Sequence, residues 1–292
     1  GLNASGRQVL KKTLRRSQVL PYFSIVPVCT VAMEGCASAH HWARQFMQLG
    51  HQVKLLPAQY VKAYVRGNKN DYNDALAIAE ASRVPEMRTV TIKTVEQQSV
   101  QALHRMRKSA VAERTALANQ LRGLLGEFGL VFNQGLSALR KVLPDILEDA
   151  ENGLPPSFRH ALSLKYEHLC QLDALVNGLT EQLAQEAGQH PEIKRLQTIP
   201  GFGAIVASAF YSVFGNGKAF NTGRDASAAL GLVPRQYSSG GKSTLLGISK
   251  RGDKYLRSLV VHGARSVVTH AHKKDDSLNL WVTRLVERRG IN

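Results

Sequence analysis

The segment Asn68-Lys69-Asn70-Asp71-Tyr72-Asn73-Asp74-Ala75 places two carboxylates three residues apart at the head of an apolar-periodic run. The periodicity predicts a helix that begins near Asp71. Residues three apart share one helix face, so both carboxylates would point at one spot. Asp71 is then either an N-cap, with Asp74 complementing the helix dipole, or both belong to a Mg²⁺ site. Taken alone, the segment favours the cap.

Composition indicates a soluble protein with a substantial core. The chain has 292 residues, of which 43% are hydrophobic, and this length predicts about two domains. No run of 18 apolar residues occurs, so no membrane association is expected. The cysteines Cys29, Cys36 and Cys170 form no Cys-x-x-Cys pair. This usage predicts a cytoplasmic protein without a zinc site or a disulfide framework.

The charge balance points to a polyanionic partner. Lys and Arg total 38 against 22 Asp and Glu, a net charge of +16. The simplest such partner is nucleic acid. A ribosomal or chromatin-like binding protein would show the same excess, so charge indicates nucleic acid more strongly than it indicates an enzyme.

The first 92 residues alternate between strand-like and helix-like patterns. Strands are expected over residues 7–14, 28–33, 51–56 and 87–92, and helices over 16–23, 38–49, 60–65 and 71–82. This alternation predicts an α/β layer. Because the chain begins at Gly1, directly before a turn, we expect that an upstream strand of a hairpin is missing.

Two long helices are expected next, joined by a loose stretch over residues 133–156. Their predicted apolar stripes are Leu103, Met106, Ala110, Leu117, Leu121, Leu124 and Phe128 on the first, and Leu162, Tyr166, Leu169, Val176, Leu179 and Leu183 on the second. Such stripes predict an antiparallel coiled-coil hairpin. It would serve as a spacer, a dimer arm or a basic binding face.

The turn Pro200-Gly201-Phe202-Gly203 opens a further helix. Small residues let the backbone approach a phosphate, and the amides of a helix N-terminus face it. Gly201 and Gly203 therefore fit a helix-hairpin-helix DNA-backbone contact. An ordinary interhelical turn explains them about as well.

Residues 234–242 and 248–252 carry a second candidate site. Ser238 and Ser239 precede a Gly pair and stand beside four cations, Arg235, Lys242, Lys250 and Arg251. A Ser-Ser-Gly-Gly loop alone is usually only flexible. Beside these cations it fits a hydroxyl nucleophile in a cationic pocket, where Gly permits close approach of a phosphate.

Four ordered motifs, AMEGC (residues 32–36), KNDYNDA (69–75), TIPGFG (198–203) and PRQYSSGGK (234–242), resemble those of the DEDD transposases of bacterial insertion sequences. That family is similar to the Piv-type DNA invertases and includes bridge-RNA-guided recombinases. The resemblance covers essentially the whole chain, and four motifs in order are far more specific than any one.

The resemblance implies three domains. An RNase H/RuvC-like α/β domain (1–93) would hold Mg²⁺, an antiparallel coiled-coil arm (94–190) would follow, and a mainly helical transposase domain (191–292) would carry a nucleophilic Ser. It also implies DNA as substrate, guidance by a structured RNA in some members, and a dimer or tetramer. In such an assembly the carboxylates of one subunit would act with the Ser of another.

Transferred residue by residue, Glu34, Asp71 and Asp74 match the last three metal ligands of the family. The nucleophile falls in the Ser238–Ser239 pair, and we favour Ser239 because it adjoins Gly240. The family's first Asp, on the first strand, has no match. Phosphoryl transfer depends on positioning and charge neutralisation, so we expect this chain to be impaired or inactive in strand cleavage relative to one with that strand.

Two alternative functions remain open at this point. A non-catalytic nucleic-acid-binding remnant explains the charge and the Pro-Gly-x-Gly turn. A RuvC-like junction resolvase explains the first 92 residues but leaves the Ser segment without a role. The three carboxylates together with the Ser pair favour a DNA transposase or recombinase, because a binding protein needs neither.

Overall fold

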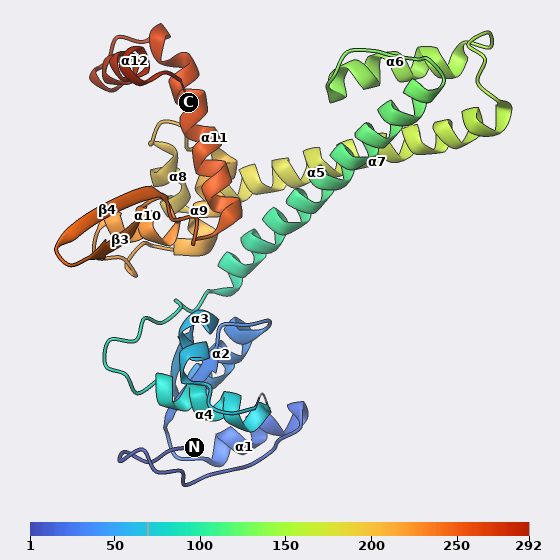
Figure 1. The fold of residues 1–292 in the computed structure, drawn as a ribbon. Helices are drawn as coiled ribbons and strands as arrows, with labels where there is room; N and C mark the ends of the chain where they lie inside the picture. The colour runs from blue at the N-terminus through green and yellow to red at the C-terminus, as the bar shows by residue number, and fades with distance from the viewer. Residues whose placement is uncertain (69, 292) are drawn as a thin grey trace. The chain divides into compact units, whose positions relative to one another are not determined.

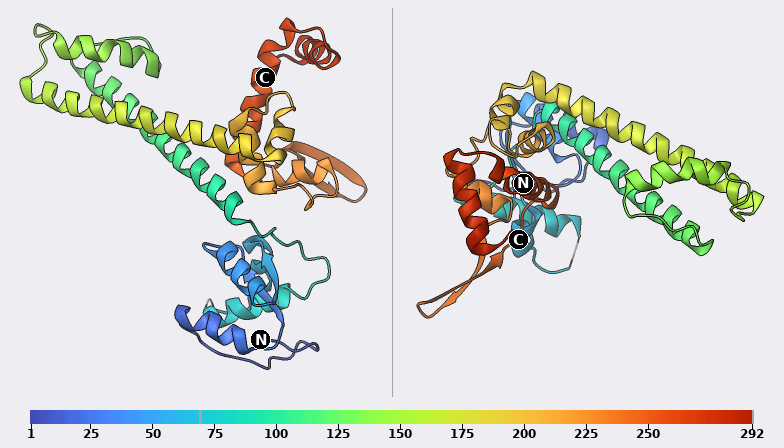
Figure 2. Two further views of the ribbon diagram at one scale, coloured as in Figure 1. Left: turned by 180° about the vertical axis from the view of Figure 1, so that it is seen from behind. Right: turned by 90° about the horizontal axis from the view of Figure 1, so that it is seen from above.

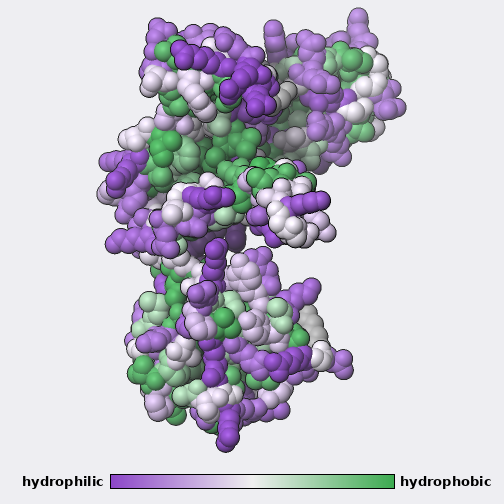
Figure 3. All heavy atoms as spheres, turned by 60° about the vertical axis from the view of Figure 1, so that its left-hand side comes forward, coloured by the Kyte–Doolittle hydropathy of each residue, from purple (hydrophilic) through white to green (hydrophobic). Residues whose placement is uncertain are grey.

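The computed structural model describes residues 1–68 and 70–291, which divide into two compact units, Gly1–Thr94 and Val95–Asn292 (Figure 1). Helices dominate, and two small two-stranded sheets accompany them, so the expected mixture of α/β and helical structure is confirmed. Among the residues described, no helix combines the length and apolarity needed to cross a bilayer. Hydrophilic residues cover much of the face seen in Figure 3, in keeping with the high charge.

The first unit is built on a parallel strand pair. Strand β1 pairs in register with β2, from Thr30 opposite Gln52 to Glu34 opposite Leu56. One core cluster joins Ala39, Ala43 and Leu55, and a second joins Leu56 to the α4 residues Ala77 and Ala81. The elements are η1 (Arg16–Gln18), α1 (Val19–Ile25), β1 (Thr30–Glu34), α2 (Ala39–Gln48), β2 (Gln52–Leu56), α3 (Ala58–Val61), η2 (Lys62–Tyr64) and α4 (Asp71–Ala81).

The prediction of two strands, over residues 7–14 and 87–92, is wrong. Residues 7–14 and 87–92 form only isolated bridges, Leu2 with Gln8 and Leu55 with Val90. A β-ladder needs a continuous partner edge, and within the residues described β1 and β2 form a ladder only with each other. The N-terminal segment is instead attached by side chains, because Tyr72 donates a hydrogen bond to Gln8 and Arg83 donates one to the Ala4 carbonyl.

The second unit begins with two long antiparallel helices, α5 (Val95–Glu127) and α7 (Pro156–Gln189). Polar contacts show that the two helices are antiparallel, because residues later in α5 contact residues earlier in α7. Arg107 donates to Thr180 at 2.8 Å, and Arg114 pairs with Asp173 at 3.0 Å. The α7 stripe is buried largely as expected, whereas the α5 stripe is confirmed only in part, at Ala110, Leu117 and Leu121. Met106 is 57% exposed, and Val100 and His104 are buried instead.

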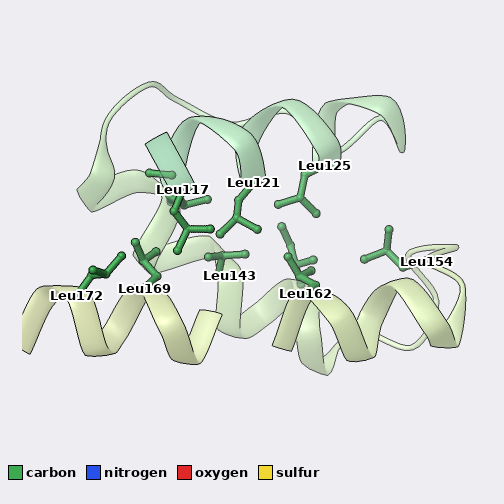
Figure 4. Close-up of a cluster of buried hydrophobic side chains, with 11 residues drawn as sticks. Leu117, Leu121, Leu125, Leu143, Leu154, Leu162, Leu169 and Leu172 are labelled. Carbon is green, nitrogen blue, oxygen red and sulfur yellow. The ribbon is translucent and has the colours of Figure 1, made fainter. Parts of the chain in front are cut away.

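A helix that the sequence did not predict, α6 (Leu136–Glu148), lies within the stretch expected to be loose. Gly135 and Pro144 suggested a loop, but Leu139, Leu143 and Ile146 recur at four- and three-residue steps and are buried. They complete a leucine-rich core with α5 and α7 (Figure 4). This apolar burial outweighs the cost of a proline inside a helix, about 3 kcal/mol.

The remainder of the second unit surrounds α9, which packs against α5, α7, α8 and α11 (Figure 2). Six of the eleven residues of α9 are buried. The hairpin β3–β4 is exposed along its whole length. The elements are α8 (Pro191–Gln197), α9 (Ala204–Phe214), α10 (Gly223–Ala229), β3 (Pro234–Ser239), β4 (Lys242–Ile248), α11 (Lys254–His270), η3 (Ala271–Lys273) and α12 (Ser277–Arg289).

Candidate functional site

The candidate metal ligands all lie in the first unit. Glu34 is the last residue of β1, and Asp71 and Asp74 lie in the first turn of α4, which packs against β1. The N-cap is Asn70, whose side chain accepts a hydrogen bond from the Asn73 amide at 2.8 Å, so the expectation that Asp71 is the cap is wrong. With that role filled by Asn70, the Asp71 carboxylate is not needed to cap the helix.

The donor chemistry of these residues fits a divalent cation. Hard cations such as Mg²⁺ prefer carboxylate oxygens, and within residues 1–68 and 70–291 no ion pair involves Glu34, Asp71 or Asp74. Glu34 and Asp74 are half-buried and Asp71 is exposed. The part of the chain that the structure describes contains no group of three or more metal-ligating side chains. The three carboxylates are thus on contacting elements but are not gathered as one ligand set.

The Ser segment is a β-hairpin and not the loop that the sequence predicted. Strands β3 and β4 are antiparallel, and Ser239 pairs with Lys242 across a two-residue turn. Gly240 and Gly241 have φ of +55° and +76°. Both central residues of such a turn lie in the left-handed region that favours glycine. The glycines therefore close a defined hairpin tip.

The two hydroxyl groups of the Ser pair differ in their contacts. Ser238 Oγ accepts a hydrogen bond from Gln236 Nε2 at 3.0 Å and a longer one from the Thr244 amide. Within the residues described, the Ser239 hydroxyl has no hydrogen-bond partner. Neighbouring residues of a strand point to opposite faces, so the two hydroxyls are presented on different sides of the hairpin. Only that of Ser239 is unengaged.

The four cations beside the Ser pair do not enclose a pocket. Arg235, Lys242, Lys250 and Arg251 are all exposed. The register places Ser239 directly opposite Lys242, so these two side chains lie on one face of the hairpin, whereas Arg235 lies at an irregularity in the strand pairing. The expected cationic pocket is thus an exposed basic face that carries a free hydroxyl.

The base of the hairpin is held by direct backbone contact. Lys250 adopts φ of +56° and donates its amide hydrogen to the Gly231 carbonyl at 2.9 Å. A Cβ on Gly252 would lie 1.9 Å from the Ala229 carbonyl oxygen. Arg257 donates to the Leu230 and Gly252 carbonyls at 2.9 and 3.3 Å. These contacts fix the position of Lys250 and Arg251 relative to β3 and β4.

Replacing Gly252 with alanine is expected to destabilise the second unit by about 2–3 kcal/mol, because backbone atoms must move to admit the methyl group. Urea denaturation of the full chain measures this change. Gly247→Ala is the matched control, since a Cβ there meets no atom within 4 Å. Equal midpoints for the two variants would contradict the close contact.

Gly201 and Gly203 lie in the turn between α8 and α9. Gly201 has φ of +84°, and its Cβ would stand 2.7 Å from the Gly263 carbonyl oxygen of α11. Packing between the two backbones therefore already explains a glycine at this position. Gly203 is the N-cap of α9, and no side chain accepts a hydrogen bond there. Of the two glycines, Gly203 is the one whose surroundings leave room for a phosphate.

A buried histidine that the sequence did not single out connects α5, α9 and α11. His104 is 2% exposed and contacts Ser208 Oγ through Nε2 at 3.0 Å and the Tyr255 hydroxyl through Nδ1 at 3.1 Å. Ser208 donates its own hydrogen to the Ala204 carbonyl at 2.6 Å, so Nε2 is the donor and Nδ1 the acceptor of a neutral ring. The sequence signal for this burial is that His104 lies four residues after the apolar Val100, on the same face of the helix.

Burial, reinforced by the charge of Arg107, lowers the pKa of His104 from 6.5 to about 4. The unfolded chain therefore binds a proton at a pH at which the folded chain does not. Stability is expected to fall, by on the order of 3 kcal/mol at most, as the pH drops from about 6.5 to 4. Denaturation at pH 4–7 measures this slope. His104→Gln should flatten it, and an unchanged slope would contradict the assignment.

Residues 5–129 match a transposase family model of the DEDD type of IS110 elements, and residues 193–278 match the transposase IS116/IS110/IS902 family. A probable family 20 transposase of Pseudomonas aeruginosa is 43% identical over all of this chain and 87% of its own length. The transposase of insertion sequence element IS1111A of Coxiella burnetii is 43% identical over all of this chain and 80% of its own. That of element IS1328 of Yersinia enterocolitica is 42% identical over 98% and 85%.

Proposed function

Because the chain belongs to the IS116/IS110/IS902 family of insertion-sequence transposases, we propose that it cuts and joins DNA with Mg²⁺-binding carboxylates and a serine nucleophile. Family membership makes it a DNA transposase and indicates dependence on a divalent metal. The observation that carries the serine assignment is the free hydroxyl of Ser239, exposed at a hairpin tip among cations.

In the proposed reaction Ser239 Oγ attacks a DNA phosphorus and forms a new P–O bond. The bond from phosphorus to the deoxyribose oxygen breaks, the serine proton is lost, and the departing sugar oxygen gains a proton. Lys242, which shares the face of Ser239, offsets the charge that develops on the phosphoryl oxygens, and Arg235 on the same strand adds to the positive potential. The sugar hydroxyl released from another strand then attacks the phosphorus of the adduct and loses its proton. The bond from phosphorus to Ser239 Oγ breaks, the serine oxygen regains a proton, and the DNA strands are joined.

Glu34, Asp71 and Asp74 would hold Mg²⁺. The bound ion would supply charge neutralisation and orientation at a phosphate. Glu34 ends β1 and the two Asp begin α4, which contacts β1, so a shift of α4 against β1 would bring the carboxylates together. Binding of metal and DNA would provide the free energy for that closure.

The remaining parts of the proposal concern architecture and partners. Residues 1–93 would form an RNase H/RuvC-like domain, residues 94–190 a coiled-coil spacer, and residues 191–292 the serine-bearing transposase domain. A homo-oligomer, dimer or tetramer, would combine the carboxylates of one subunit with Ser239 of another. A structured guide RNA would supply the choice of sequence by base pairing, with its backbone on the basic surface.

A labelled DNA carrying an element end tests the proposed function under single-turnover conditions, in which excess protein makes even slow cleavage measurable. The expected result is a protein–DNA adduct that forms with Mg²⁺ and is absent with EDTA. Binding without cleavage would instead favour the nucleic-acid-binding remnant. Cleavage of four-way junctions without an adduct would favour the junction resolvase.

A further inference from the structure

The N-terminal segment carries a concentrated positive charge that the proposed reaction has not used. Before Glu34 the sequence contains five cations, Arg7, Lys11, Lys12, Arg15 and Arg16, and no acidic residue. All five are exposed, and none takes part in an ion pair within the residues described. We refer to Lys11, Lys12, Arg15 and Arg16 as the cation row.

Aromatic rings of the first unit hold three members of the cation row in place. Lys11 Nζ lies 4.0 Å from the centre of the Tyr72 ring, and Lys12 Nζ lies 4.4 Å from that of Tyr22. The Arg16 guanidinium lies 5.1 Å from the centre of the Trp42 ring. A cation over an aromatic face keeps its charge while its mobility falls. The row is therefore pre-organised, with its charges left available for an anion.

One end of the row lies at the carboxylate helix. Tyr72, beneath Lys11, belongs to the first turn of α4 and stands between Asp71 and Asp74 in the sequence. The same tyrosine donates a hydrogen bond to Gln8, and Arg83 of the region after α4 donates to the Ala4 carbonyl at 2.9 Å. The segment is thus attached to Tyr72 of α4 through Gln8 and Lys11, and to the residues after α4 through Ala4.

We propose that the cation row binds successive backbone phosphates of the DNA strand presented to Glu34, Asp71 and Asp74. This inference rests on the proposed function, because it takes DNA as the substrate of that site. From Lys11 to Arg16 the backbone spans at most about 18 Å. Successive phosphates of one strand are about 3.4 Å apart along the duplex axis, so the row can follow at most about five of them, enough for its four cations.

Neutralising the row in the full chain tests the proposal. The variant Lys11→Gln, Lys12→Gln, Arg15→Gln, Arg16→Gln is expected to weaken binding to a 30-base-pair duplex about 30–100-fold near 0.1 M salt. The magnitude of the slope of log affinity against log salt should decrease by about 3.6, since each of the four phosphate contacts contributes roughly 0.9. Fluorescence anisotropy measures both, and circular dichroism verifies that the variant is folded.

The matched control removes four exposed lysine charges from the second unit, by Lys141→Gln, Lys165→Gln, Lys273→Gln and Lys274→Gln. It should lose less than about threefold in affinity. A loss equal to that of the row variant would show that only overall charge matters and would overturn the proposal.

Unchanged binding by the row variant would also overturn the proposal, while leaving the proposed function standing. No DNA binding by the unaltered chain would instead refute the proposed function. Tighter binding of an equally long RNA duplex would overturn the assignment to DNA.

Two further measurements locate the contact. Tyr72→Phe retains the ring under Lys11 and should keep the affinity, whereas Tyr72→Leu removes the ring and should weaken binding about threefold. A photoreactive residue at the exposed Thr13, between the two cation pairs, should crosslink to DNA, whereas one at Val131, 84% exposed in the second unit, should not. Equal affinities of the two Tyr72 variants, or crosslinking at Val131 alone, would contradict the proposal.

Discussion

Ser239→Ala is expected to abolish the covalent protein–DNA adduct, a loss of roughly 10³-fold or more, because the change removes the hydroxyl that is proposed to attack, and the neighbouring Ser238 hydroxyl is engaged in hydrogen bonds. The variant should still bind DNA with unchanged affinity, since it removes a hydroxyl and no charge. Gel electrophoresis of denatured protein with labelled DNA measures the adduct, and anisotropy measures the binding. Adduct formation by Ser239→Ala at the original rate would refute the assignment.

Ser238→Ala is the matched control on the same strand. Its hydroxyl already accepts hydrogen bonds from Gln236 and the Thr244 amide, so it has a structural role within the hairpin. Its removal is expected to slow adduct formation by no more than about tenfold. If Ser238→Ala lost the adduct and Ser239→Ala kept it, the two roles would be exchanged and the basis of the choice would be wrong.

Neutralising a carboxylate is expected to have the second largest effect. Glu34→Gln and Asp74→Asn should each weaken the binding of Mn²⁺, used as a paramagnetic substitute for Mg²⁺, by on the order of 10–100-fold, because hard cations depend on charged oxygen ligands. Water proton relaxation measures this binding without reference to catalysis. Fold stability should change little, because no ion pair in the described chain is lost.

Glu80→Gln provides the control within α4. Glu80 also carries a carboxylate, but it pairs with Arg66 at 3.4 Å on the surface, and removing such a pair costs little. Its Mn²⁺ affinity should equal that of the unaltered chain. Equal affinities in all three variants would show that Glu34 and Asp74 hold no metal.

The sequence correctly predicted elements whose apolar pattern is regular. It did not predict elements whose formation depends on a partner that is distant in the sequence. The periodicity over residues 71–82 and the leucine stripe of α7 each gave a helix of nearly the correct length. The segments 7–14 and 87–92 have strand-like composition, but pairing depends on a neighbouring edge that local pattern cannot reveal. Helix α6 is not evident from sequence because Gly135 and Pro144 are typical of loops, whereas the burial of Leu139, Leu143 and Ile146 that stabilises the helix depends on α5 and α7.

The candidate site was predictable in its residues and not in its geometry. Ser239 and the Gly pair were recognised from sequence. The Gly pair in the sequence is equally compatible with a flexible loop, and only the positive φ of both glycines shows that the segment is a hairpin. The different surroundings of Ser238 and Ser239 depend on cross-strand register, which composition does not encode. His104 was overlooked because one polar residue within a helix stripe resembles a surface position until its partners Ser208 and Tyr255 are known.

The central claim is that Ser239 becomes covalently joined to DNA during strand exchange. The most direct measurement is to trap the unaltered chain on nicked suicide DNA with Mg²⁺, digest protein and DNA, and sequence the modified peptide by mass spectrometry. The account predicts a nucleotide phosphate on Ser239, within the peptide that contains Gly240 and Gly241. A phosphate on any other residue, or strand exchange without a modified peptide, would contradict it.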